Sequence, residues 1–407
     1  MLRTRPARRL IRALLLGVAL PACTAGTADR AVVVRDSAGV ALVEHGVVQP
    51  DAAPPWTLSS APLLRIGTVD GEALLQFDRV RDATRLRDGS IVVVDGSHTI
   101  RRFGADGTPR WSAGREGKGP GEFEAPIMVD EITGDSLVVW DAVAGRLSVF
   151  ATDDGAFIRA ATVPNVGPNS RVWTVPDQRG LLVGALRWDR QRIDGHEALA
   201  HDIELSLVDL DGRVVRPLGT RDFATLYQEV DENGAFSEAV FGAFAVIGAS
   251  ADGFWYGDPG ESELREESAA DQPRRIVRWS TPDRTVTEAD VAALLAKWTE
   301  ETEEPAVRSF LAEYGRTHPR ADRFPAYDAL HVDDLGRLWL QDYVREHEDD
   351  ASRRWTILAP DGTAILGRLL HPIGFSVHDI GTDWILGVEK DDLDVETLAL
   401  YRIILDR

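Results

Sequence analysis

The sequence has 407 residues, of which 44% are hydrophobic and 27% are charged. This composition is typical of a globular protein and excludes a disordered chain. With 66 acidic and 45 basic residues the formal net charge is −21, which argues against binding to nucleic acid and against direct adsorption on an anionic membrane.

Residues 1–23 have the features of a bacterial export signal. The apolar run Ala13–Leu20 is preceded by a cluster of arginines: Arg3, Arg5, Arg8, Arg9 and Arg12. A charged start followed by a short apolar run and small residues is typical of a signal peptide. The run is much shorter than the roughly 20 residues that a membrane-spanning helix needs, so we expect this segment to be cleaved.

The segment Leu20–Cys23 reads Leu-Pro-Ala-Cys and resembles a bacterial lipobox. Cys23, the only cysteine, is then predicted to be the lipidated first residue of the mature protein, and an ordinary secretory signal is the alternative. Thr24 follows it instead of the Asp that retains many lipoproteins at the inner membrane. We therefore expect anchoring to the outer membrane through acyl chains, facing the periplasm or the cell surface, and a mature fold without disulfides.

Residues 24–55 are predicted to form a tether and a hairpin. The hairpin consists of two valine-rich segments on either side of the turn Asp36–Gly39, a combination that is typical of paired strands. Prolines between Pro50 and Pro55 interrupt this pattern. We expect the main domain to cover residues 56–407.

Six segments of this domain share one pattern, in which an inner strand, a turn, a valine- or tryptophan-rich strand, a third strand and a second turn follow one another. The turns are Asp-Gly-type dipeptides such as Asp88–Gly89 and Asp361–Gly362, which suit tight hairpins because these residues tolerate positive φ. Repetition of such a unit predicts an all-β fold, a six-bladed β-propeller.

The sixth segment ends after its third strand, Leu398–Leu405, and lacks a fourth. The segment Leu63–Gly67 has the pattern of that missing strand. An N-terminal strand is therefore expected to complete the C-terminal blade and close the ring, which hides sheet edges.

A helical insertion of about residues 286–318 is expected between blades four and five. Thr287–Asp290 has the pattern of a capping box, and Val291, Leu294 and Trp298 follow with helical spacing. The insertion would lie over one face of the ring, either as a cap that packs on the rim or over a binding mouth.

The segments Arg115–Phe123, Val34–Val40 and Leu386–Val395 resemble bacterial six-bladed β-propeller lipoproteins of the NHL-like type. The resemblance covers nearly the whole mature chain, and the Gly-Pro-Gly-Glu-Phe connector is its most specific part. It implies the propeller fold and a cell-envelope location. It implies no particular activity.

Two histidines occupy equivalent places on the predicted inner strands. His331 and His378 each precede a turn position by five residues, and the same place in the other segments is held by Thr84, Asp130, Val175 and Gly248. Imidazoles in one register on neighbouring blades could bind a divalent metal or share a proton, and some NHL-type propellers, including amidating lyases, hold a metal in this way. His331, His378 and Asp130 are the candidate ligands, and a structural or solvated role is the alternative.

These features predict a lipid-anchored, extracytoplasmic propeller that binds a small molecule or a protein through its loops or channel. The alternative is a metal-assisted lyase or lactone hydrolase with its site in the channel, and a structural subunit of an envelope complex is a third possibility. The sequence identifies no ligand, no catalytic group and no oligomeric state.

Overall fold

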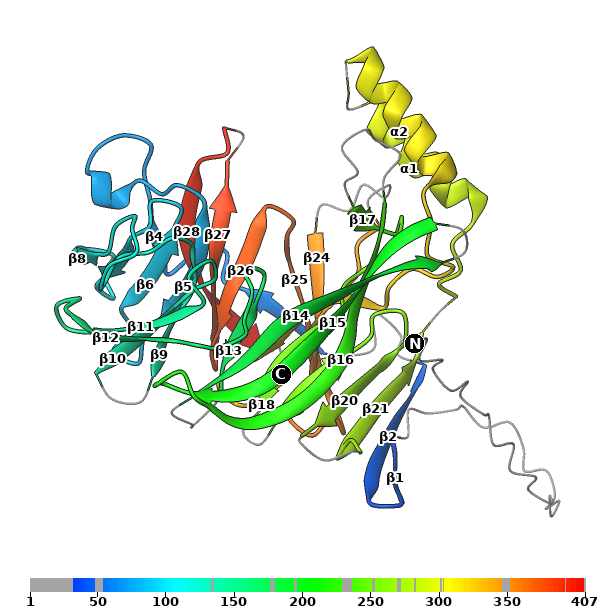
Figure 1. Cartoon of the computed structure of the whole chain (residues 1–407), viewed down its shortest axis with the longest axis horizontal. Helices are drawn as coiled ribbons and strands as arrows, with labels where there is room; N and C mark the ends of the chain where they lie inside the picture. Colours follow the sequence, from blue (N-terminus) through cyan, green and yellow to red (C-terminus); the bar gives the residue numbers. More distant parts are fainter. Residues whose placement is uncertain are drawn as a thin grey trace, which may run out of the picture.

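The computed structural model describes residues 32–47, 54–132, 135–175, 180–193, 196–228, 236–250, 253–268, 272–281, 283–300, 302, 304–345, 352–391 and 393–405. The expected signal peptide 1–23 and Cys23 lie outside the described residues. The chain is mostly β, with two α-helices, and its sheets succeed one another around the molecule in the manner of a β-propeller (Figure 1). None of the described helices is long and apolar enough to cross a membrane.

Two four-stranded antiparallel sheets open the repeated region. The first has the order β5 (Val80–Arg85), β6 (Ile91–Asp95), β7 (Ile100–Phe103), β8 (Pro109–Ala113). The second comprises β9 (Pro126–Ile132), β10 (Ser136–Asp141), β11 (Arg146–Ala151) and β12 (Phe157–Thr162). In both sheets the second strand is buried along nearly its whole length, because other sheets cover both of its faces.

The third sheet has five strands, three of them unusually long. They are β13 (Arg171–Thr174), β14 (Gly180–Ile193), β15 (His196–Asp209), β16 (Val214–Gln228) and β17 (Phe236–Glu238). The sequence pattern predicts only the start of β14, around Leu181–Val183. The rest of that strand is largely exposed, so it lacks the apolar alternation that reveals a strand in a sequence.

The fourth sheet is widened by the N-terminal hairpin. It contains β18 (Val246–Ser250), β19 (Gly253–Gly257), β20 (Glu263–Glu267) and β21 (Arg275–Ser280). Strands β1 (Val33–Ser37) and β2 (Val40–Val47) form the hairpin, and β2 pairs in parallel with β21. The hairpin thus becomes the outer edge of this sheet.

The last two repeats are joined into one nine-stranded sheet. Its strands are β22 (Tyr327–Val332), β23 (Leu338–Asp342), β24 (Ser352–Leu358), β25 (Ile365–Pro372), β26 (Phe375–Ile380), β27 (Trp384–Lys390), β28 (Glu396–Leu405), β3 (Pro55–Leu58) and β4 (Leu64–Ile66). Strand β4 pairs with β28, which is the pairing that the sequence predicts, and a short 3-10 helix (Ala73–Leu75) follows β4. Strand β3 connects the two repeats by pairing with β25 and with β28.

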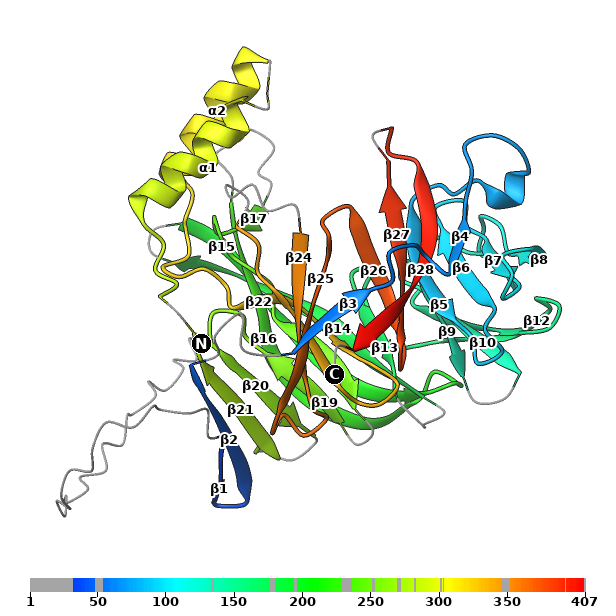
Figure 2. The same cartoon turned by 180° about the vertical axis from the view of Figure 1, so that it is seen from behind.

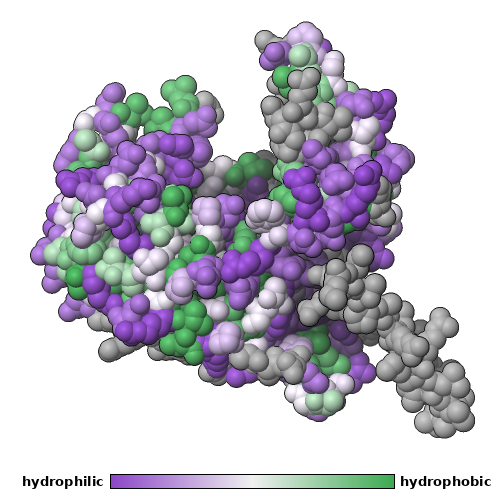
Figure 3. Space-filling view, viewed as in Figure 1, coloured by the Kyte–Doolittle hydropathy of each residue, from purple (hydrophilic) through white to green (hydrophobic). Residues whose placement is uncertain are grey.

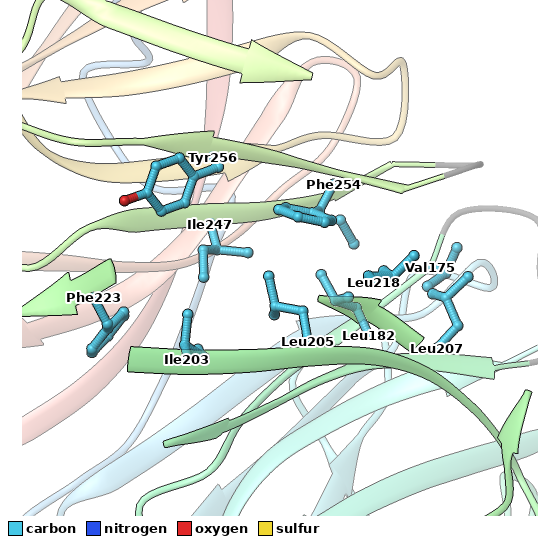
Figure 4. Close-up of a cluster of buried hydrophobic side chains, with 11 residues drawn as sticks. Val175, Leu182, Ile203, Leu205, Leu207, Leu218, Phe223, Ile247, Phe254 and Tyr256 are labelled. Atoms are coloured by element: carbon cyan, nitrogen blue, oxygen red, sulfur yellow. The ribbon is translucent and has the colours of Figure 1, made fainter. Parts of the chain in front are cut away.

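The hydrophobic core is divided into layers between adjacent sheets. One layer places Leu182, Ile203 and Leu205 of the third sheet against Ile247 and Phe254 of the fourth (Figure 4). A second joins Trp140 of the second sheet to Leu181 and Val208 of the third. Trp140 and Trp339 are both fully buried, so these large rings fill the space between sheets.

The helices α1 (Glu288–Glu300) and α2 (Pro305–Thr317) form a hairpin that projects from the sheets (Figures 1, 2 and 3). The capping box is present, since Thr287 and Asp290 exchange hydrogen bonds between side chain and backbone N–H. Val291 and Leu294 pack against Phe241 and Phe324. The hairpin also contacts the third sheet, because Ser237 and Tyr314 share a hydrogen bond of 2.9 Å.

Candidate functional site

A cavity of about 760 Å³ lies between the first strands of successive sheets, and we call it the channel. It is lined by residues of β5, β9, β13, β18, β22 and β26. All positions that the sequence places in one register contribute to its wall: Thr84, Asp130, Val175, Gly248, His331 and His378. Counting back from the turns therefore identifies residues that surround the channel.

Irregularities in two inner strands add side chains that the register does not include. The pairing of β26 with β27 shifts between Val377 and Asp379, so His378 is an extra, unpaired residue. A similar shift in β5 lies between Val80 and Asp82. Such a bulge redirects the side chains around it. Asp82 and Asp379, which lie outside the register, line the channel together with His378.

Two carboxyl groups meet at one hydroxyl in the channel wall. Oγ1 of Thr84 lies 3.1 Å from Oδ2 of Asp379 and 3.3 Å from Oδ1 of Asp130. The other oxygen of Asp130 accepts a hydrogen bond from the Thr174 hydroxyl, and Oδ2 of Asp379 accepts one from the Arg85 backbone N–H at 2.9 Å. We call Asp130 and Asp379 the acid pair, and Thr84 its bridge.

The acid pair holds a proton at neutral pH. Burial, and then the proximity of Asp130, raises the pKa of Asp379 to about 8. Burial also raises the pKa of Asp130 to about 6. The hydrogen bonds also indicate one bound proton, because the hydroxyl of Thr84 can donate to only one of its two carboxyl neighbours. A proton on Asp379 lets that carboxyl donate to Thr84 while Thr84 donates to Asp130.

The two predicted histidines lie in different surroundings. Nδ1 of His378 is 3.5 Å from Oδ1 of Asp82, and Asp82 is itself held by the backbone N–H groups of Ala83 and Val129, each at 3.0 Å. Burial lowers the pKa of His331 to about 4. His331 is therefore neutral at pH 7, and its imidazole can accept a proton or a hydrogen bond without bearing charge.

The predicted metal ligands share the channel but do not form a metal-binding group. In the described part of the chain, no three His, Cys, Asp or Glu side chains are arranged to hold a metal ion. His378 faces Asp82, and both oxygens of Asp130 are hydrogen-bonded. A metal held by His331, His378 and Asp130 stays a prediction from the sequence.

Several other charged groups of the channel wall have contacts that hold the fold together. The carboxylate of Asp333 binds Arg337 and the indole N–H of Trp339. Glu131 accepts a hydrogen bond from the Arg87 backbone N–H, and the Arg85 guanidinium lies 5.1 Å from the ring centre of Trp384. Among the carboxyl oxygens of the acid pair, Oδ1 of Asp379 has no hydrogen-bond partner among the described residues.

Sequence reasoning missed Asp82, Asp379 and Thr174. Asp379 is adjacent to His378, and regular alternation would direct the two side chains to opposite faces of the strand. The bulge brings both to the channel, and no residue type at this point signals it. Thr174 likewise lies next to a register position, Val175, at the end of β13, so counting back from the turns does not select it.

No family model matches the chain, and no curated protein matches its sequence. Among solved structures, a protein of Bacteroides fragilis that is described as exported has a TM-score of 0.51 at 11% identity, with 90% of this chain and 100% of that chain covered. This likeness concerns the fold alone.

Two further likenesses are weaker. The WD40 repeats of RRP9 have a TM-score of 0.43 at 8% identity, covering 86% of this chain and 99% of theirs. The PQQ-bound aldose sugar dehydrogenase of Streptomyces coelicolor has a TM-score of 0.42 at 12% identity, covering 86% of this chain and 100% of its own. Neither score supports an argument about this chain.

Proposed function

We propose that this chain is a lipid-anchored, six-bladed β-propeller of the cell envelope that binds a small ligand in its channel. The anchor is supported by the lipobox-like segment ending at Cys23. A closed ring is supported by the six first strands around one cavity and by the pairing of β4 with β28. The fold that it shares with an exported protein of Bacteroides fragilis accords with an extracytoplasmic location.

The acid pair carries the proposal for the ligand. Burying two carboxyl groups side by side destabilises the folded state. Oδ1 of Asp379 has no hydrogen-bond partner among the described residues, so it can accept a hydrogen bond from a ligand. Asp82 adds a further carboxylate in the same wall. Such a wall favours a ligand that donates hydrogen bonds, through an amine or several hydroxyl groups, over a ligand that only accepts them.

Native mass spectrometry of the mature protein isolated from its own envelope tests this function. We expect a small molecule bound in equal amount to the protein. The double variant Asp130→Asn/Asp379→Asn should lose it, and the exposed control Asp154→Asn should keep it. A ligand retained by the double variant would place binding outside the channel and contradict the proposal.

The location needs its own experiment. Cys23→Ser should move the protein from the membrane fraction to the soluble periplasmic or secreted fraction, because the acyl chains can no longer be attached. Unchanged sedimentation with membranes would show that another feature anchors the chain.

An enzyme that works by proton transfer is the second candidate. The observation that favours it is the pairing of a protonated Asp379 with a mainly ionised Asp130 at neutral pH, since two carboxyl groups with separated pKa values can act as general acid and general base. A screen with lactones and with substrates for elimination tests it. Turnover that falls at least about a hundredfold in Asp379→Asn would support catalysis, and no turnover with either class would leave the binding function.

A further inference from the structure

A second cavity of about 540 Å³ lies where three of these strands, β5, β9 and β13, begin. It is lined by Arg79 and Arg81 before and at the start of β5, by 124–127 before and at the start of β9, and by 168–171 before and at the start of β13. The channel is lined instead by the later residues of these three strands. We call the second cavity the strand-start pocket, and the two cavities occupy opposite ends of the inner strands.

The charge of the strand-start pocket is positive, in contrast to the chain as a whole. Its two acidic wall residues are already neutralised, because Asp95 pairs with Arg101 at 2.7 Å and Glu124 pairs with Lys118 at 3.1 Å. Arg81 and Arg171 form no ion pair with any described residue. In a protein with a formal charge of −21, two arginines without carboxylate partners in one cavity are free to bind an anion.

Part of the pocket wall is apolar. The rings of Phe223 and Phe244 lie 5.4 Å apart between centres, and Leu186 and Leu226 line the cavity beside them. His201 belongs to the same wall, and burial lowers its pKa, so it is uncharged at neutral pH. A cavity of this size with an apolar wall and a few polar groups is suited to a ligand of small-molecule size.

We propose that the strand-start pocket binds an organic carboxylate with an aromatic or alkyl body. The guanidinium groups of Arg81 and Arg171 bind the carboxylate, because the planar fork of arginine matches the two oxygens of this group. The body of the ligand packs against Phe223, Phe244 and Leu226. The site is distinct from the channel and prefers the opposite charge, so it stands whether or not the channel binds a ligand.

Isothermal titration calorimetry with three probes of one framework tests this site: phenylbutyrate, phenylbutanol and phenylbutylamine. Phenylbutyrate should bind more tightly than the alcohol, and the amine should bind least. The double variant Arg81→Gln/Arg171→Gln should lose at least about tenfold in affinity for phenylbutyrate. Arg110→Gln removes a charge from the exposed strand β8 and should keep wild-type affinity.

Both arginines are exposed, so the double variant is expected to fold, and its thermal unfolding should match that of the wild type. Equal affinity for phenylbutyrate and phenylbutanol would overturn the proposal, because the arginines would then contribute nothing. An equal loss in Arg110→Gln would also overturn it, since the effect would belong to the overall charge. So would the absence of saturable binding of phenylbutyrate up to about 10 mM, a concentration above the dissociation constants of even weak specific sites.

Discussion

Asp130 and Asp379 come from different sheets, yet their carboxyl groups lie 3.3 and 3.1 Å from one atom, the hydroxyl oxygen of Thr84. A hydroxyl group supplies one proton, so it can donate to only one of them at a time. The other carboxyl must carry a proton to avoid repulsion between oxygens.

The stability of the fold should decrease as the pH rises from about 6.5 to about 8. The pKa of Asp379 is about 8 in the folded protein, against an ordinary value of 3.8 for an exposed Asp. The folded state therefore binds the proton more tightly than the unfolded state does. This stabilisation is lost as the pH rises to the pKa of the folded state. The expected loss over this interval is about 1–2 kcal/mol. His331 does not interfere, because its pKa is lowered and its effect lies between about 4 and 6.5.

Urea unfolding at a series of pH values measures this effect. In Asp379→Asn, which mimics the protonated carboxyl, the free energy of unfolding should vary less with pH over the same interval. The surface variant Asp154→Asn should retain the wild-type slope. An identical slope in Asp379→Asn would show that Asp379 is ionised in the folded protein.

Replacing Thr84 by Val should destabilise the fold, whereas replacing it by Ser should have little effect. Val preserves the shape but removes the hydroxyl that lies between two buried carboxyl groups, and loss of such a partner costs about 1–3 kcal/mol. Thermal and urea unfolding at pH 7 measure the change. Equal stability of the Val and Ser variants would mean that the hydroxyl does not bridge the acid pair.

Asp333→Ala should be among the most destabilising substitutions in the chain. Arg337 is buried, and Asp333 is its counter-ion. Arg337 also donates to the carbonyl oxygens of Gly381 and Thr382 in the next repeat, at 3.2 and 2.8 Å. Leaving a buried charge without its partner costs about 3–5 kcal/mol.

Equilibrium unfolding compares this variant with Asp211→Ala, which removes the carboxylate that pairs with Arg159 and Arg213 at the surface. Each exposed pair should contribute no more than about 1 kcal/mol. Similar losses in the two variants would contradict a special role for the Asp333–Arg337 pair.

The metal prediction is tested by elemental analysis of the mature protein purified without chelator, beside the double variant His331→Ala/His378→Ala. If the histidines bind a metal, the wild type should contain it in stoichiometric amount and the variant should not. A metal lost in the variant would favour the metal-assisted enzyme, and no metal in either protein would contradict the metal prediction.

Much of the fold could be predicted because the turn dipeptides in the sequence lie between paired strands in the structure. The turn at Asp88–Gly89 joins β5 and β6, and that at Asp361–Gly362 joins β24 and β25. The long extensions of β14, β15 and β16 could not be predicted, because their exposed residues pair mainly with one another and carry no apolar periodicity.

The site could be predicted only in part. Counting back from the turns identifies Thr84, Asp130, His331 and His378 because repeats place equivalent residues at equivalent depths. The acid pair could not be found in this way, since Asp379 reaches the channel through a bulge. The strand-start pocket was also missed. Its positive charge depends on the ion pairs of Asp95 with Arg101 and of Glu124 with Lys118, and the sequence does not show which carboxylates are paired.

The pairing of β4 with β28 has a consequence for the order in which the chain can mature. A protein is synthesised from its N-terminus, so β4 is made long before its partner at Leu398–Leu400. Until then β4 lacks the partner that it has in the finished fold. A copy that is truncated or stalled before Glu396 therefore keeps unpaired strand edges, which invite aggregation and proteolysis. Pairing of β4 with β28 thus distinguishes a chain that contains β28 from a shorter fragment, whose unpaired strand edges expose it to proteases.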